Sequence, residues 1–202
     1  MPKIVDDQMR EATRRRIMRV AASEFARLGF DLANINAIAE QAGIGKGSIY
    51  LYFENKRDLF LEMLRSIAQA QLTVIRAALA PEGTLRQRLE RLFRAFARLA
   101  EEESDNFNVY MSALYGVNRA FQAEAIKLLR DYVAVIALML EQSQARGEIR
   151  CPDVEATALM VLSLTESYVL SAKVLGQSEQ VIVQQAGPVA ELILRGIGPS
   201  AS

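Results

Sequence analysis

A short polar cluster holds the residues of this sequence that are best suited to contact another molecule. Lys46, Gly47 and Ser48 follow one another and combine a cation, a residue without a side chain and a small hydroxyl. A lysine and a hydroxyl can bond to base edges in the major groove of DNA, and a glycine lets the backbone come close. The cluster therefore favours recognition of DNA over catalysis.

Two helices joined by a sharp turn are predicted to position this cluster. Apolar residues at helical spacing form the inner face of the first helix: Ile35, Ile38, Ala39 and Ala42. Gly43 follows, where the positive φ of a turn is easily reached only by glycine. The second helix has its own apolar edge: Ile49, Tyr50 and Phe53. This pattern predicts a helix-turn-helix, whose second helix enters the major groove, with Lys46 and Ser48 in its first turn.

The same stretch resembles the TetR family of bacterial transcriptional repressors. Residues 13–30 are similar to that family's first helix and the Gly-Phe that follows it, and residues 45–60 to its recognition helix and the start of helix four. The resemblance is specific over residues 13–64 and diffuse beyond. Two departures are Gly45, where a capping Ser or Thr is usual, and Leu51, where a polar or aromatic phosphate contact is frequent. The resemblance implies a homodimeric repressor with an effector pocket in its C-terminal helices.

The expected DNA contacts divide by role. Lys46 and Ser48 are expected to contact base edges, Gly47 to bring the backbone near the duplex, and Asn36 to contact adenine. The resemblance and their polar tips assign phosphate contacts to four residues: Asn34, Tyr50, Tyr52 and Lys56. Tyr50 has an alternative role in the core. Arg14, Arg15 and Arg16 could reach the flanking backbone or form a solvated face.

The periodicity is helical from end to end, so we predict an all-α protein. Residues 1–58 are expected to form a three-helix DNA-binding head and residues 59–202 a helical ligand-binding and dimerisation domain. A fourth helix should run through the boundary. Several residues predict helix starts: Asn34, Asn55 with Asp58, Thr84, Asp153 and Ser178. Apolar residues of the last two long helices predict the dimer interface: Leu159, Leu162, Val169, Leu170, Val189, Leu192 and Ile193.

The family resemblance also implies an effector pocket in the C-terminal domain, lined by aromatic, Met and other apolar residues. The predicted lining is Phe93, Phe96, Phe107, Tyr110, Met111, Leu114, Tyr132, Ile136, Met139, Glu166 and Tyr168. The apolar members are equally suited to ordinary core packing. Glu166 lies in an otherwise apolar helix, where a carboxylate is costly unless it is paired or solvated. It could face a cationic ligand, a partner subunit or water.

Composition excludes several classes of function. The chain has no histidine, which removes His metal sites and Ser-His or Cys-His nucleophile pairs, and we expect no enzyme and no cofactor. The single cysteine fits a reducing cytoplasm, and no apolar run is long enough for a membrane span. A net charge of zero does not by itself indicate DNA.

The expected partners are therefore double-stranded operator DNA, an unidentified small apolar or aromatic effector, and a second copy of the chain. Two alternatives remain open. One is a helix-turn-helix regulator that activates transcription or responds to no ligand. The other is an all-helical scaffold for protein interactions.

Overall fold

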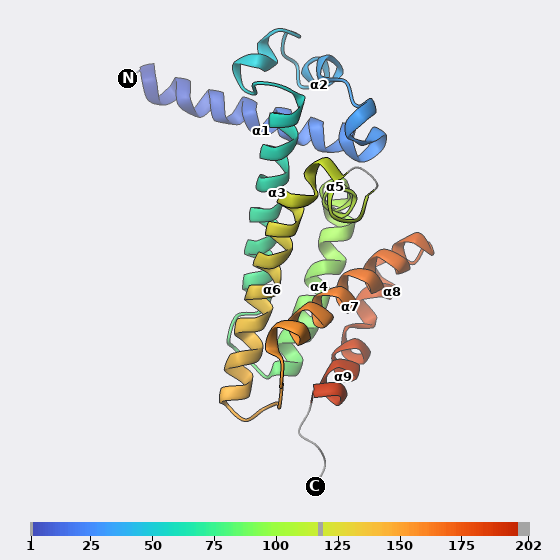
Figure 1. Cartoon of the computed structure of the whole chain (residues 1–202). Coiled ribbons are helices and arrows are strands. Elements are labelled where there is room, and N and C mark those ends of the chain that lie inside the picture. Colours follow the sequence, from blue (N-terminus) through green and yellow to red (C-terminus); the bar gives the residue numbers. More distant parts are fainter. Residues whose placement is uncertain (1, 117–118, 198–202) are drawn as a thin grey trace. The chain divides into compact units, whose positions relative to one another are not determined.

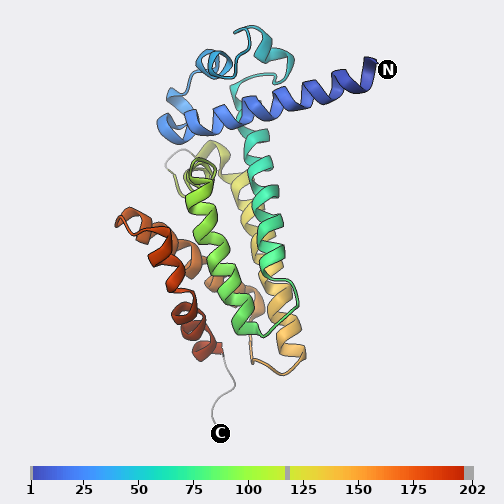
Figure 2. The ribbon, with the colours of Figure 1, turned by 180° about the vertical axis from the view of Figure 1, so that it is seen from behind.

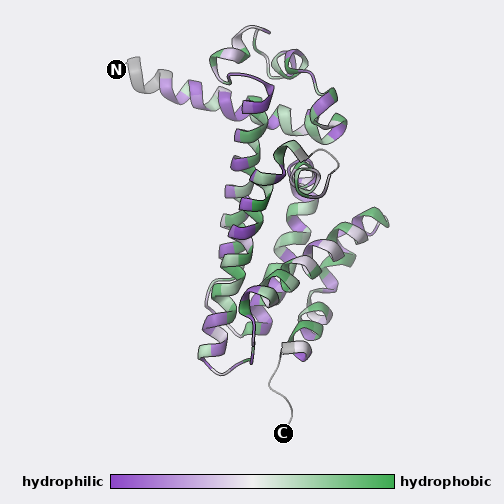
Figure 3. Cartoon of the chain, in the orientation of Figure 1, coloured by the Kyte–Doolittle hydropathy of each residue, from purple (hydrophilic) through white to green (hydrophobic). Residues whose placement is uncertain are grey.

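The computed structural model describes residues 2–116 and 119–197, and within these ranges the chain is helical without strands (Figure 1). This confirms the predicted all-α class. The helices are α1 Pro2–Leu32, α2 Ile35–Gln41, η1 Ser48–Leu51, α3 Lys56–Ala78, α4 Leu85–Glu102, α5 Ser104–Tyr115, η2 Arg119–Phe121, α6 Gln122–Ala145, α7 Val154–Val174, α8 Glu179–Gln184 and α9 Ala186–Ile197. Figure 3 shows polar and apolar residues mixed along the long helices, as amphipathic helices require.

The chain packs as two compact units. The first unit comprises Met1–Ala68 and Asp105–Ala125, and the second unit comprises Gln69–Ser104 and Ile126–Ser202. The division therefore falls inside α3, and α5 with the segment after it belongs to the first unit. The sequence predicts a boundary after residue 58 between a DNA-binding head and a C-terminal domain. The two packing units do not test that boundary, so it stays a prediction.

In the first unit, α1 supplies an apolar stripe that α2 covers. Ile17, Ala21 and Phe25 of α1 are buried, as are Ile38 and Ala39 of α2. Gly29 lies near the end of α1, and its φ of 72° and ψ of 170° interrupt the helical backbone. The chain can then turn back, so that α2 packs on the helix that precedes it.

The predicted helix starts are confirmed by hydrogen bonds at the helix ends. The Asn55 side chain accepts from the Asp58 N–H at 2.9 Å, and the Asp58 carboxylate accepts from the Glu54 N–H at 3.0 Å. Thr84 and Gln87 form a complete capping box before α4. Asp153 and Ser178 cap α7 and α8 through their side chains. Such caps satisfy N–H groups that have no partner inside the helix.

The second unit is organised around α4, which packs against α7, α8 and α9 (Figure 2). The apolar face of α4 is buried, including Leu89, Leu92 and Phe93. The last predicted helix is interrupted, as its Gly-Pro pair suggests, and the break separates α8 from α9 at Gln185. Pro188 lies in the first turn of α9, where its missing N–H costs no hydrogen bond.

Candidate nucleic-acid interface and effector site

The turn after α2 has the geometry that the sequence predicts. Gly43 adopts a φ of 68°. Its N–H donates to the Glu40 carbonyl at 3.0 Å, and the Ile44 N–H donates to the Ala39 carbonyl at 3.0 Å. This pair of bonds is the Schellman motif, which ends a helix with its last carbonyls satisfied. At the other end, the Asn34 side chain accepts from the Asn36 N–H at 2.9 Å, which confirms the predicted cap.

The second helix of the motif is shorter and begins later than predicted. The Ser48 N–H donates to the Gly45 carbonyl at 2.8 Å, and η1 then covers only Ser48–Leu51. The prediction that Lys46 lies in the first helical turn is therefore wrong, because Lys46 and Gly47 precede that turn. Gly47 is the N-cap and provides no side-chain bond, so little stabilises a longer helix here.

The faces of this segment also differ from the prediction at one position. Ile49 and Phe53 are buried, with exposed fractions of 0% and 2%, whereas Tyr50 is 52% exposed. Placing Tyr50 on the apolar edge is therefore wrong, as is its alternative role in the core. The 3-10 helix has three residues per turn, so residue 50 points about 120° away from residue 49. The Phe53 N–H donates to the Ile49 carbonyl at 3.1 Å, which brings residue 53 back to the side of residue 49.

All eight residues predicted to contact DNA leave some surface accessible. Five are exposed: Asn34, Asn36, Lys46, Gly47 and Tyr50. Three are half-buried: Ser48, Tyr52 and Lys56. They come from the start of α2, the turn, η1 and the start of α3, which belong to the same compact unit. Their contacts with DNA stay a prediction.

Two arginines of α1 hold the end of η1 in place. The Arg14 Nη1 donates to the Tyr52 carbonyl at 2.8 Å, and its guanidinium lies 4.6 Å from the centroid of the Phe53 ring. Arg14 also forms an ion pair with Glu62. The Arg10 Nη2 donates to the Leu51 carbonyl at 3.2 Å. Arg10 is not among the residues predicted from the sequence, although its spacing of four from Arg14 places both on one helical face.

Lys56 is committed in part to the fold. Its Nζ donates to the carbonyls of Asp31 at 3.1 Å and Ala33 at 3.0 Å, and lies 4.7 Å from the Phe30 ring centroid. These contacts tie the junction between α1 and α2 to the start of α3. A lysine ammonium has three donors, so one of them remains for a phosphate.

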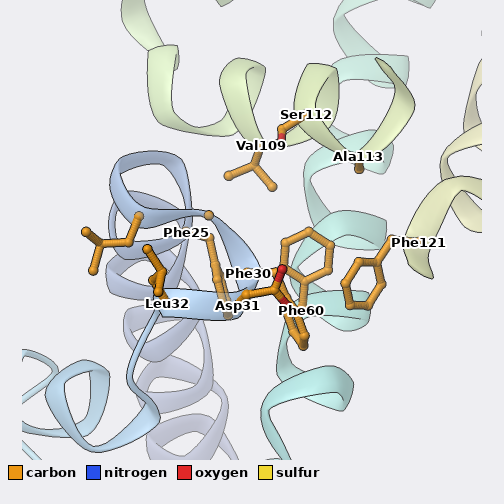
Figure 4. A pocket seen from close by; sticks show the side chains of 11 residues that line it. Phe25, Phe30, Asp31, Leu32, Phe60, Val109, Ser112, Ala113 and Phe121 are labelled. Carbon is orange, nitrogen blue, oxygen red and sulfur yellow. The ribbon is translucent and has the colours of Figure 1, made fainter. Parts of the chain in front are cut away.

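An aromatic cluster lies beneath this junction and borders a hollow of about 250 Å³ (Figure 4). Phe60 lies 4.2 Å from Phe121 and 5.0 Å from Phe25 between ring centroids. From α5, Val109, Ser112 and Ala113 line the hollow. The α5 residues predicted to line the effector pocket lie on its opposite helical face and are buried: Phe107, Tyr110, Met111 and Leu114.

The other predicted effector residues belong to the second unit. Six are buried: Phe93, Phe96, Tyr132, Ile136, Met139 and Glu166. Tyr168 is half-buried, and its ring centroid lies 5.5 Å from that of Phe93. The second unit has two open hollows of about 430 Å³ each, and Met139 lines the one between the end of α3 and α6. The predicted effector residues thus divide between the two units.

Glu166 is the most unusual of these residues. It is 2% exposed, and among the described residues neither carboxylate oxygen has a hydrogen-bond partner. Burial raises the pKa of Glu166 to about 8. Burial and then the nearby charge of Glu166 raise the pKa of Tyr132 above its usual value. The Tyr132 hydroxyl donates to the Gln71 Oε1 at 2.8 Å, which brings α3 and α6 together.

A second buried charge, Arg88, is not among the residues predicted from the sequence. Arg88 of α4 is fully buried, and its Nη2 donates to the Ser143 hydroxyl at 2.8 Å and to Glu148 Oε2 at 3.4 Å. The signal in the sequence is its position between Leu85, Leu89 and Leu92 on the inner face of the helix. Arg88 joins the start of α4 to the end of α6 and the turn after it.

Two other features are absent from the described residues: a metal site and a membrane-spanning helix. No group of acidic, cysteine or histidine side chains there is arranged to bind a metal ion. No described helix combines the length and the apolar character that crossing a bilayer requires.

Comparison with known proteins assigns both parts of the chain. Residues 17–63 match the family model of bacterial regulatory proteins of the tetR family. Residues 82–169 match the model of the tetracyclin repressor-like C-terminal domain. The fatty acid metabolism regulator protein of Bacillus subtilis (strain 168) is 22% identical over 182 residues, which cover 90% of this chain and 93% of the relative.

Two further similarities cover the head and the whole fold. The probable acrEF/envCD operon repressor of Escherichia coli (strain K12) is 39% identical over 67 residues, or 30% of each chain. The crystal structure of the regulator FadR from Bacillus subtilis, in complex with stearoyl-CoA, has a TM-score of 0.79. It is 22% identical, and the match covers 90% of this chain and 98% of that one.

These relatives are regulators of transcription and not enzymes, in agreement with the expectation from composition. The two family models follow each other along the chain in the order head, then C-terminal domain, and the helix-turn-helix lies inside the first. The chain therefore belongs to the TetR family and is a DNA-binding transcriptional regulator.

Proposed function

We propose that the protein is a homodimeric repressor that leaves its operator when a small apolar or aromatic molecule binds its C-terminal domain. The observation that carries this proposal is the exposure of Lys46 and Gly47 on a turn whose far end is fixed by Arg10 and Arg14. A surface that recognises DNA should hold its polar groups in fixed positions, because ordering mobile groups on binding costs free energy and lowers the affinity.

The contacts with DNA are assigned as follows. Lys46 and Ser48 bond to base edges, and Asn36 reaches an adenine from the start of α2. Gly47 allows the backbone to approach. Phosphates are held by four residues: Asn34, Tyr50, Tyr52 and the remaining donor of Lys56. Arg15 and Arg16 are exposed on α1 and are suited to the flanking backbone.

The dimer forms through α7 and α9. Leu159, Met160 and Leu192 have exposed fractions of 44%, 70% and 62%, which is apolar surface that a second copy would cover. The predicted interface needs correction, since Leu162 and Val169 are both 0% exposed in the single chain and belong to its core. A dimer would place two recognition segments roughly 34–36 Å apart, or slightly more, on a palindromic operator.

The effector site is assigned to the predicted aromatic and aliphatic residues that are buried in the second unit: Phe93, Phe96, Tyr132, Ile136 and Met139. The relative crystallised with stearoyl-CoA supports an apolar ligand. Because α3 contributes residues to both compact units, a ligand that favours one position of α3 would change the affinity for DNA. A coupling of about 1–3 kcal/mol would lower that affinity roughly 5–150-fold.

The test begins with the purified chain and a random pool of DNA duplexes. Selection should enrich a palindromic operator, and its binding should weaken steeply as the salt concentration rises. Adding stearoyl-CoA or another apolar ligand found by thermal shift should then release the operator. Placing the operator ahead of a reporter gene decides between repressor and activator. A chain that sediments as a monomer and binds all duplexes alike would refute the proposal.

A further inference from the structure

Three polar side chains from different helices are buried in the second unit. Gln71 of α3, Tyr132 of α6 and Glu166 of α7 have exposed fractions of 3%, 1% and 2%. The Tyr132 hydroxyl donates to the Gln71 Oε1 at 2.8 Å. Within the described part of the chain, the Gln71 Nε2 and both Glu166 oxygens have no hydrogen-bond partner. Among these three side chains, one amide donor and one carboxylate are thus left without a partner.

Cations elsewhere in the same unit have partners of their own. Lys173 lies seven residues after Glu166 on α7, but its Nζ contacts the Ala100 carbonyl and bonds to Glu101 Oε2 at 3.0 Å. The buried Arg88 bonds to Ser143 and Glu148. Neither cation bonds to Glu166, and no other side chain of the described residues forms a hydrogen bond with its two oxygens.

The surroundings on α7 are apolar. Leu162 and Val169, one turn to either side of Glu166, are fully buried. The hydroxyl of the adjacent Thr165 donates to the Val161 carbonyl at 2.8 Å and is therefore not available to Glu166. An unpaired polar group among apolar side chains costs free energy, which a ligand with the matching group would recover.

We propose that Glu166 and Gln71 form the polar end of the effector site, and that the effector is an apolar molecule with a protonated amine. The amine donates to the Glu166 carboxylate, and an oxygen or ring nitrogen of the ligand, where it has one, accepts from the Gln71 Nε2. The inference rests on the proposed function and narrows it, because it distinguishes a cationic ligand from neutral or anionic apolar ligands of the same size.

The test compares three probes that share one alkyl chain: decylamine, decanol and decanoate. Each is titrated into the full-length protein below its micelle-forming concentration, with thermal shift and calorimetry as readouts. Decylamine should bind roughly 10–100-fold more tightly than decanol, because a hydrogen bond to a buried charge is a strong one. Above about pH 8, where Glu166 is ionised, decanoate should bind most weakly, since its carboxylate then repels that of Glu166.

Glu166→Gln keeps the size of the side chain and removes its charge, so it should reduce the affinity for decylamine to that for decanol. Without ligand this variant should be at least as stable as the native chain, since it replaces an unpaired buried carboxylate. Glu155→Gln is the matched control, because Glu155 is exposed on the same helix and should leave the preference for decylamine intact.

Two results would overturn the inference: equal binding of decylamine and decanol, or unchanged binding of decylamine by Glu166→Gln. The proposed function can fail separately. If decylamine binds through Glu166 but leaves the affinity for the selected operator unchanged, the site stands and the repressor switch does not. If stearoyl-CoA releases the operator equally from the native chain and Glu166→Gln, and decylamine does not bind, the switch stands and the cationic effector does not.

Discussion

The two compact units use polar side chains in opposite ways. In the first unit, Arg10, Arg14 and Lys56 lie near the surface, and each donates to backbone carbonyls at the ends of helices. In the second unit, Gln71 and Glu166 lie in the interior with bonding capacity unused. Surface bonds to the backbone fix a shape, whereas unused interior groups lower stability until something binds them. This difference agrees with the proposed recognition surface in the first unit and with the proposed effector site in the second.

The largest expected effect concerns pH and tests the second unit. The pKa of the Glu166 carboxyl is raised from 4.5 to about 8, so the folded chain holds a proton that the unfolded chain releases. Its stabilising contribution is fully present below pH 4.5 and is lost as the pH rises to about 8. Between these two pH values, the loss of this contribution should lower the free energy of unfolding by about 1.4 kcal/mol for each pH unit.

Denaturant titrations of the native chain and Glu166→Gln from pH 5 to 9 measure this contribution. The stability gained by the variant should grow with pH and level off above about pH 8. Glu155→Gln should give a curve parallel to that of the native chain. A parallel curve for Glu166→Gln would show that its carboxylate is stabilised by a partner after all.

The next prediction concerns the packing of the first unit. Phe60→Ala should lower the free energy of unfolding by about 3–5 kcal/mol, because Phe60 is buried among Phe25, Phe30 and Phe121. Leu32→Ala is the control, since Leu32 is 77% exposed and its loss should cost less than about 0.5 kcal/mol. Thermal unfolding followed by circular dichroism measures both. If both variants lost less than about 0.5 kcal/mol of stability, the head would not be packed around Phe60 as described.

Two lysines of the first unit, Lys46 and Lys56, are expected to contribute differently to DNA binding. Lys46→Ala should weaken binding to the selected operator by about 1–3 kcal/mol and relax the preference at one base position. Lys56→Ala should weaken all duplexes alike and reduce the salt slope by about one. Because Lys56 also bonds to the Asp31 and Ala33 carbonyls, its variant alone should lose thermal stability. Anisotropy titrations at several salt concentrations measure the binding, and equal loss of specificity would refute the division of roles.

The smallest effect concerns a helix cap in the second unit. Thr84→Ala removes one half of the capping box before α4 and should cost about 1 kcal/mol of stability. Thr84→Asn keeps a capping oxygen and should restore most of it. Operator affinity should be unchanged in both variants, since the cap lies outside the unit that carries the proposed DNA contacts. A change in operator affinity would show that the second unit's stability influences the head.

Local features of the sequence predicted much of the fold. The caps at Asn34, Thr84 and Asp153 and the breaks at Gly29 and Gly43 were all identifiable from residue type and spacing. The recognition segment was predicted less well. Local periodicity grouped Tyr50 with Ile49, but packing against the rest of the head selects a four-residue spacing and exposes Tyr50.

The proposed effector site shows what the sequence could not predict. Glu166 could be singled out as a carboxylate in an apolar helix, yet water, a partner subunit and a ligand were equally open. Its burial, and the placement of Gln71 and Tyr132 together in the same interior, depend on how α3, α6 and α7 pack. Likewise, Leu162 and Val169 looked suitable for a dimer face until packing placed them in the core.

The sequence by itself determined the helical class, the capped helix starts, the helix-turn-helix and the absence of histidine chemistry, because each follows from residue types a few positions apart. Only the tertiary structure decided which polar groups would be satisfied. Arg10 and Arg14 reach carbonyls 41 and 38 residues away, and Tyr132 reaches Gln71 across 61 residues. Hydrogen bonds over such separations depend on the packing of whole helices, which no local pattern encodes.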